Sequence, residues 1–280
     1  MKAEVERRRT LPTQIMGILN VTPDSFSDGG QYTTVDAAVA HAVAMIEQGA
    51  SIVDVGGEST RPGAAPVDAK TERKRIMPVV RELVARGIPV SIDTRRARVA
   101  LAAVEAGAQL VNDVSGGLSD PEMARVVAET GVLYAVMHWR EGGADAIPDY
   151  RNVVSEVRRE LKGRIAHLIV EGVKPEQIIV DPGIGFGKTA EQNWQLLGHL
   201  PQIASLGHGV LVGASRKRFL GALLPADDAA DPDPVQRDAP TAVISALAAR
   251  SGAWAVRVHD VASSRLALDV AEHWRIGAST

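Results

Sequence analysis

Residues 90–115 read VSIDTRRARVALAAVEAGAQLVNDVS, and they contain one complete repeat of the fold. A short apolar run covers 90–94, a segment with helical spacing follows over 95–106, and a second apolar run covers 110–115. Gly107 separates the helical segment from the second run, as expected where a helix ends in the left-handed conformation. The stretch therefore predicts a β-strand, an α-helix and a second strand parallel to the first.

Apolar runs rich in Val and Ile recur along the chain, at residues 15–20, 52–57, 90–94, 110–115, 133–138, 178–182, 210–215 and 256–260. Their continuous apolar character predicts strands that are covered on both faces, as in a parallel sheet. Helical patterns occupy 35–48, 71–86, 95–106 and 122–130, and a glycine follows each. Eight such repeats in 280 residues predict an α/β fold with a single (β/α)₈ TIM barrel, and an open doubly wound sheet is the alternative.

Three segments are longer than ordinary connections. Residues 21–34 follow the first predicted strand and residues 57–68 include the end of the second, so these long loops are expected to serve the active site. The acidic segment 225–240 lies between the last two strands, where a solvated surface excursion is favoured over a functional role. The chain is predicted to consist of an N-terminal extension, residues 1–14, and a barrel domain, residues 15–276.

The composition excludes several classes of protein. A net charge of −3 argues against binding to nucleic acid or to an anionic membrane, since both select a basic excess. The absence of cysteine excludes disulfides, thiolate metal sites and cysteine nucleophiles, and it fits a reducing compartment. No apolar stretch reaches the roughly 20 residues of a membrane span, and the basic N-terminus precedes no apolar run. We therefore expect a cytoplasmic protein without a nucleic-acid or membrane partner.

Functional residues of a barrel gather at the C-terminal ends of its strands. Nearly every predicted strand carries polar residues there: Asn20, Asp54, Glu58, Asp93, Asn112, Asp113, His138, Asp181, Ser215, Arg257 and His259. Helix capping explains one or two of them, whereas a buried carboxylate needs hydrogen-bond donors that a ligand can supply. The 2-amino-N3–H edge of a pterin or guanine presents two parallel donors. Because cations also follow the last two strands, the pattern predicts a flat heterocycle beside an anion such as phosphate.

Seven segments, in order between about Ile15 and Trp274, carry a resemblance to a known family. They are 20–30 (NVTPDSFSDGG), 54–63 (DVGGESTRPG), 91–94 (SIDT), 112–117 (NDVSGG), 181–188 (DPGIGFGK), 213–221 (GASRKRFLG) and 257–259 (RVH). The sequence resembles the dihydropteroate synthases. The resemblance implies a barrel that condenses 6-hydroxymethyl-7,8-dihydropterin diphosphate with 4-aminobenzoate, giving 7,8-dihydropteroate and diphosphate in folate synthesis. It also implies a homodimer, formed through late helices.

The resemblance further implies roles for individual residues. Asp93, Asp181 and Lys217 would be catalytic, and with Asn112 they would bind the pterin. Asn20, Thr22, Arg257 and His259 would hold the diphosphate, and Asn20 would also bind Mg²⁺. The aminobenzoate, with which sulfonamides compete, would contact Thr60, Arg61, Pro62, Phe186 and Ser215. We expect the carboxylates to stabilise positive charge on the pterin methylene while Mg²⁺, Arg257 and His259 stabilise the leaving diphosphate.

Several alternatives stay open at this point. The glycine-rich stretch 183–189 lacks the spacing of a phosphate-binding P-loop, and a structural role is favoured for His138. Glu58 and Arg216 are as easily structural as functional, and Trp254 and Trp274 are expected in the core or at a subunit interface. Two rival functions are a methyltetrahydrofolate-dependent methyltransferase domain and a non-catalytic pterin-binding paralogue.

Overall fold

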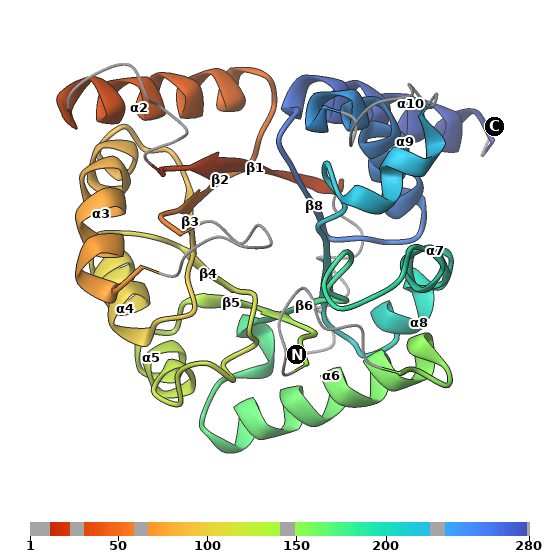
Figure 1. The fold of residues 1–280 in the computed structure, drawn as a ribbon, viewed down its shortest axis with the longest axis horizontal. Helices are drawn as coiled ribbons and strands as arrows, with labels where there is room; N and C mark the ends of the chain where they lie inside the picture. The colour runs from red at the N-terminus through yellow and green to blue at the C-terminus, as the bar shows by residue number, and fades with distance from the viewer. Residues whose placement is uncertain (1–11, 23–30, 59–66, 141–148, 225–232, 279–280) are drawn as a thin grey trace.

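A computed structural model describes residues 12–22, 31–58, 67–140, 149–224 and 233–278 of the chain. Its eight strands are all parallel and close into a barrel in chain order, with β1 paired to β8 (Figure 1). The strands are β1 (Gln14–Asn20), β2 (Ile52–Gly56), β3 (Val90–Asp93), β4 (Leu110–Asp113), β5 (Leu133–Met137), β6 (Ile178–Asp181), β7 (Gly209–Val212) and β8 (Ala255–Val258). The predicted (β/α)₈ barrel is confirmed, and the open sheet is excluded by the pairing of the first strand with the last.

Helices surround the ring of strands (Figure 1). The α-helices are α2 (Gln31–Glu47), α3 (Ala69–Ala85), α4 (Ala97–Glu105), α5 (Met123–Thr130), α6 (Val153–Val170), α7 (Ala190–Gly198), α8 (Leu200–Ala204), α9 (Asp238–Arg250) and α10 (Val261–Gly277). Short 3₁₀ turns are η3 (Pro175–Gln177), η4 (Arg218–Leu223) and η5 (Pro234–Arg237). All four glycines predicted to end helices, Gly49, Gly87, Gly107 and Gly131, have positive φ angles. Only glycine adopts this conformation without a steric penalty, so the glycine pattern was a valid signal.

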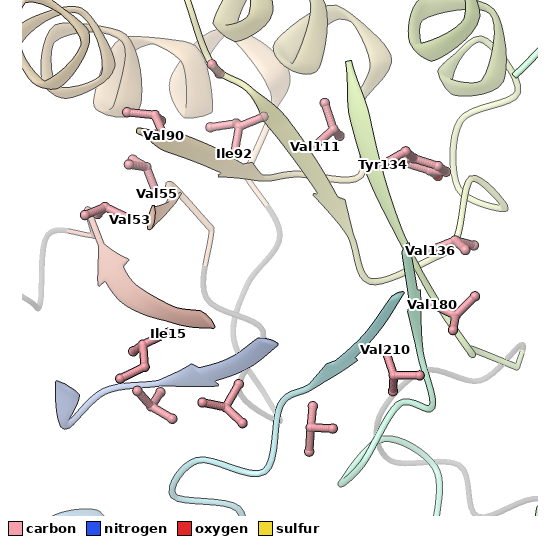
Figure 2. Close-up of a cluster of buried hydrophobic side chains, with 14 of the residues drawn as sticks. Ile15, Val53, Val55, Val90, Ile92, Val111, Tyr134, Val136, Val180 and Val210 are labelled. Carbon is pink, nitrogen blue, oxygen red and sulfur yellow. The ribbon is translucent and has the colours of Figure 1, made fainter. Parts of the chain in front are cut away.

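Two apolar layers hold the barrel together. Residues on the outer faces of the strands pack against the helices, and Figure 2 shows part of this layer, including Ile15, Val53 and Ile92. A smaller cluster lines the interior and consists of Met16, Ile52, Leu110, Ala135, Ile179, Leu211, Trp254 and Ala255. Trp254 is thus a core residue, whereas Trp274 on α10 is exposed. The interior cluster fills the barrel below the site. The polar side chains nearer the C-terminal strand ends therefore lie above a packed apolar layer.

The described barrel runs from Gln14 at the start of β1 to Gly277 at the end of α10, one residue beyond each predicted bound. The division into a 1–14 extension and a barrel domain stays a prediction, since residues 1–11 lie outside the described part. Much of the three long predicted segments also lies outside it, at 23–30, 59–66 and 225–232. Within the described ranges, no helix has both the length and the apolar character of a membrane span.

Candidate functional site at the barrel mouth

Strand register places several predicted site residues at one level of the barrel. Asn20 is aligned with Gly56, Gly56 with Asp93, and Asp93 with Asn112. Because successive side chains of a strand alternate between its faces, Asp54, two residues before Gly56, points to the same interior. Gly56 lies between Asn20 and Asp93 and has no side chain. A Cβ at this position would lie 3.8 Å from Asn20 Oδ1 and 3.6 Å from Asp93 Cβ, so both side chains are close to it.

The buried carboxylate of Asp54 is the centre of a hydrogen-bond network. It accepts hydrogen bonds from Ser91 Oγ at 2.5 Å, Asn112 Nδ2 at 2.9 Å and Arg257 Nε at 2.6 Å. The Arg257 guanidinium also donates to Asp93 Oδ2 at 2.6 Å. Arg257, expected from the resemblance to hold diphosphate, is therefore bound to two carboxylates from β2 and β3. No role was predicted for Asp54 from the sequence, although its place two residues before Gly56 in an apolar strand indicates an inward carboxylate.

Asp181 and Lys217 lie on the opposite side of the mouth, at the end of β6 and after β7. Asp181 Oδ1 accepts a hydrogen bond from the backbone N–H of Gly183 at 2.7 Å. The Lys217 ammonium lies 3.7 Å from the centre of the Phe186 ring, a cation–π contact that joins the predicted pterin and aminobenzoate residues. The site thus holds partly to fully buried charged groups of both signs close together.

Burial shifts the ionisation of these charged groups toward neutrality. It raises the pKa of Asp93 to about 7, although the positive charge of Arg257 opposes the rise. It also raises the pKa of Asp181, against the hydrogen bond from Gly183 and the charge of Lys217. Burial lowers the pKa of Lys217 to about 8, an effect strengthened by Arg257 and opposed by Asp181 and Asp93. Perturbed groups clustered in one mouth are typical of a functional site.

Ser215 and His259 are brought together at the ends of β7 and β8. Ser215 Oγ lies 2.9 Å from His259 Nδ1 and accepts a hydrogen bond from the His259 backbone N–H at 3.1 Å. Asp260 follows directly and caps α10 through the Ser263 N–H. The predicted diphosphate and aminobenzoate sides of the site are therefore in contact here. Of the other predicted residues, Asn20 ends β1 and Thr22 lies two residues beyond it, whereas Thr60, Arg61 and Pro62 lie outside the described residues.

The glycine-rich loop after β6 does not present its backbone N–H groups to a phosphate. The N–H of Gly183 is bound to Asp181, that of Gly185 to Asn193 Oδ1 at 2.7 Å, and that of Phe186 to the Gly183 carbonyl at 3.2 Å. These internal bonds fold the loop so that Phe186 meets Lys217. The N–H groups of Gly183, Gly185 and Phe186 are therefore occupied by acceptors within the protein, which does not favour a phosphate site there.

Two residues whose roles were open have structural partners. Glu58 forms ion pairs with Arg95 at 2.6 Å and Arg96 at 2.5 Å. Burial opposes ionisation of Glu58, but the hydrogen bonds from Arg96 and Arg95 keep its pKa below the ordinary value. Arg216 donates both Nε and Nη2 to Asp238 at 2.7 Å, which holds the start of α9 against the β7 end. Of the two adjacent basic residues, Lys217 therefore reaches the site and Arg216 supports the scaffold.

The structure is a closed (β/α)₈ barrel whose C-terminal mouth carries buried carboxylates, an amide and cations. This combination is typical of an enzyme that binds a flat heterocycle rich in hydrogen-bond donors together with an anion. Comparison with known proteins agrees: residues 16–259 match the model of the pterin binding enzyme family. The chain therefore belongs to the pterin-binding enzymes.

The relatives within that family are dihydropteroate synthases. The enzyme of Mycobacterium leprae is 55% identical over 266 residues, which cover 94% of each chain. The solved structure of Xanthomonas albilineans dihydropteroate synthase with 4-aminobenzoic acid is 44% identical, has a TM-score of 0.87 and covers 94% of this chain and 93% of its own. The same enzyme in complex with 7,8-dihydropteroate is 42% identical, with a TM-score of 0.84 and 94% coverage of both chains. The predicted family, barrel fold and transferase function are confirmed.

Proposed function

We propose that the chain condenses 6-hydroxymethyl-7,8-dihydropterin diphosphate with 4-aminobenzoate, releasing 7,8-dihydropteroate and diphosphate. The observation that carries the proposal is the barrel mouth, where Asp93 and Asp181 lie beside Arg257 and Lys217. A relative of the same fold binds 4-aminobenzoic acid, and another structure of that relative holds 7,8-dihydropteroate. The expectation of a cytoplasmic enzyme of folate synthesis is part of this proposal.

The acceptors on β3, β4 and β6 would bind the pterin. Asp181 and Asp93 end β6 and β3, Asn112 is the last residue but one of β4, and all three face the interior, where their oxygens can accept from the 2-amino and N3–H groups. The Asn112 amide is oriented by its bond to Asp54, which leaves its oxygen free of that contact. Preorganised acceptors of this kind add little reorganisation energy when substrate binds.

The same carboxylates would act on the charge that develops during C–O cleavage. As diphosphate leaves, the pterin methylene becomes more positive, and the buried negative charges of Asp93 and Asp181 stabilise it more strongly than they would in water. Lys217, on the same side of the mouth as Asp181, balances the negative charge of the site and contacts the Phe186 ring. The aromatic amine has low basicity and needs no strong general base, so positioning supplies much of the rate.

Diphosphate would lie near the ends of β1 and β8, beside Asn20, Thr22, Arg257 and His259. The implied Mg²⁺ fits Asn20, because its amide oxygen is a hard ligand and lies next to Gly56, as does the Asp93 carboxylate. Mg²⁺ usually keeps several waters and takes only one or two protein ligands together with phosphate oxygens. When bound, it supplies positive charge to the diphosphate oxygens. Ser215 Oγ lies 2.9 Å from His259 Nδ1 and orients the His259 ring at the end of β8.

Aminobenzoate would enter on the side of Phe186 and Ser215, with Thr60, Arg61 and Pro62 as further expected contacts. The Phe186 ring offers an apolar surface, and Lys217 above it offers a cation for the carboxylate. A flat anionic aromatic substrate matches both groups. A structure of the Yersinia pestis enzyme is a complex with a sulfonamide drug, which supports the expectation that sulfonamides bind this chain.

The exposed apolar face of α9 and α10 supports a homodimer. The two helices pack side by side near the C-terminus (Figure 1). Val243 and Leu247 on α9 and Leu266, Val270 and Trp274 on α10 recur at intervals of four residues, and each is more than half exposed. A second copy of the chain would cover this apolar stripe, which a soluble monomer seldom leaves in water.

The proposed reaction is tested with pterin diphosphate, 4-aminobenzoate and Mg²⁺, by measuring diphosphate release and dihydropteroate formation. We expect both products in equal amounts, and a loss of about 100-fold or more in kcat for Asp181→Asn. Pterin binding without diphosphate release would favour the non-catalytic paralogue. Methyl transfer from methyltetrahydrofolate, with no diphosphate release, would favour the methyltransferase alternative. A sulfonamide that fails to compete with aminobenzoate would contradict the assignment of the Phe186 side.

A further inference from the structure

Lys188 is a buried cation that the proposed reaction does not use. It lies near the end of the loop between β6 and α7, and only 8% of the residue is exposed. Its ammonium lies 2.9 Å from the Gly183 carbonyl, 3.0 Å from the Phe186 carbonyl and 3.2 Å from His138 Nδ1. Burial lowers its pKa to about 7, and the negative charge of Asp181 opposes that fall.

The partners of Lys188 are all acceptors. His138 Nε2 lies 2.9 Å from Glu160, and the hydrogen bonds from His138 and Arg140 lower the pKa of Glu160 to about 2. An ionised Glu160 only accepts, so the proton of the neutral His138 ring is on Nε2 and Nδ1 is an acceptor. Two carbonyls and one ring nitrogen therefore match the three N–H donors of a protonated lysine.

This cross-link acts on a loop that has no regular secondary structure. Gly183, Gly185 and Gly187 all have positive φ angles, between 55° and 77°, so the backbone relies on side-chain contacts to keep its path. Lys188 joins two carbonyls three residues apart and attaches them to the end of β5 through His138. The loop in turn packs on Lys217, because a Cβ at Gly185 would lie 2.6 Å from Lys217 Cδ.

We propose that Lys188 is a positioning residue that fixes Phe186 and, through it, Lys217 for binding of the aromatic amine substrate. The contacts form one continuous path: Glu160 to His138, His138 to Lys188, Lys188 to the Phe186 carbonyl, and the Phe186 ring to Lys217. Two of the three proposed pterin acceptors, Asn112 and Asp93, are held by a separate network around Asp54 and Arg257. The third, Asp181, contacts the loop through the Gly183 N–H. Because two of the three are held independently of Lys188, its loss affects binding of the aromatic amine more than binding of the pterin.

The test measures both KM values in Lys188→Met, with Lys162→Met as the matched control, because Lys162 is an exposed lysine on α6. The inference rests on the proposed function for the identity of the two substrates. We expect the KM for 4-aminobenzoate to rise about tenfold or more in Lys188→Met, from loss of charge-assisted hydrogen bonds, while the KM for pterin diphosphate changes less than about threefold. Lys162→Met should retain both wild-type values.

A second pair of variants addresses the case in which Lys188→Met fails to fold. His138→Asn keeps an acceptor oxygen close to the position of Nδ1, whereas His138→Gln replaces Nε2 and removes the acceptor for Lys188. We expect the aminobenzoate KM to rise in the Gln variant and to stay nearer wild type in the Asn variant. Equal rises in both KM values, or wild-type values in Lys188→Met, would overturn the proposal. Absence of diphosphate release by the wild-type chain would instead count against the proposed function.

Discussion

At the scale of single residues, the most consequential contact is the ion pair between Asp54 and Arg257, 203 positions apart in the chain. Asp54 has no solvent exposure and no ligand role assigned to it, yet it orients Asn112 and Arg257. Arg257 is shared with Asp93, so each of the two carboxylates is positioned by the same guanidinium. A buried charge is tolerated only with such partners, because desolvation otherwise outweighs any attraction.

Asp54→Asn tests this dependence. The substitution keeps the shape of the side chain but removes the charge that compensates Arg257, and we expect a loss of about 3 kcal/mol in the free energy of unfolding. Urea denaturation measures it. Asp269→Asn is the matched control, because Asp269 pairs with Arg265 on the exposed face of α10. That surface pair should contribute about 0.5 kcal/mol or less, and equal losses in the two variants would contradict the argument.

At the scale of elements, the glycines in the connections between strands and helices have different local surroundings. Gly183 lies between β6 and α7 on the side of the site, and Gly131 lies between α5 and β5. Gly183 and Gly131 have nearly the same φ, 70° and 72°. A Cβ at Gly183 would lie 2.3 Å from the His138 carbonyl oxygen, whereas a Cβ at Gly131 would meet nothing within 4 Å. Both positions favour glycine because the backbone has a positive φ angle. Only at Gly183 must the residue also lack a side chain, because the His138 carbonyl oxygen lies so close to it.

Replacing each of these glycines by alanine separates the two effects. Gly131→Ala should lower the free energy of unfolding by about 1 kcal/mol, the steric penalty of an L-residue in the left-handed region. Gly183→Ala should lower it by about 3 kcal/mol, since the backbone of β5 or of the loop must also move. The same variant should raise the KM for aminobenzoate, because Phe186 lies three residues further along the loop. Equal losses of stability would show that close packing at Gly183 is unimportant.

At the scale of the whole molecule, the apolar residues that stabilise the barrel and the polar residues of the candidate site lie in different layers. The interior cluster around Met16, Leu110 and Trp254 closes the lower part of the barrel, and the polar groups lie above it. The exposed apolar residues of α9 and α10 lie on the outside of the barrel, with α10 extending toward the C-terminus (Figure 1). A homodimer through this face would leave the barrel mouth open to substrate.

Val270→Arg tests the dimer. A charged side chain in the middle of the α10 stripe should convert the dimer to a monomer, because an unpaired buried charge at an interface weakens association strongly. Sedimentation velocity or light scattering measures the mass against the 29.7 kDa of one chain. Val170→Arg is the control, since Val170 is an exposed valine on α6 and lies outside the stripe. A wild-type chain that runs as a monomer would contradict the dimer proposal.

Much of the fold could be predicted because its signals are local. Apolar runs, helical spacing and a glycine after each helix repeat along the chain, and all depend on the residues within one repeat. Closure of the barrel follows from the number of repeats. The candidate site was predictable in outline for the same reason, since Asp93, Asn112 and Asp181 are among the last two residues of strands whose C-terminal ends share one edge.

The sequence by itself therefore determined the barrel, the helix ends and the edge at which polar groups collect, because these follow from periodicity and strand direction. Only the tertiary structure decided which polar groups are partners. Arg257 lies with Asp54 and Asp93, Lys188 with His138, and Arg216 with Asp238 while its neighbour Lys217 reaches Phe186. The physical reason is that the alternation of side chains along a strand sets the face on which each one lies. Closure of the barrel, in contrast, sets which side chains of other strands lie opposite it.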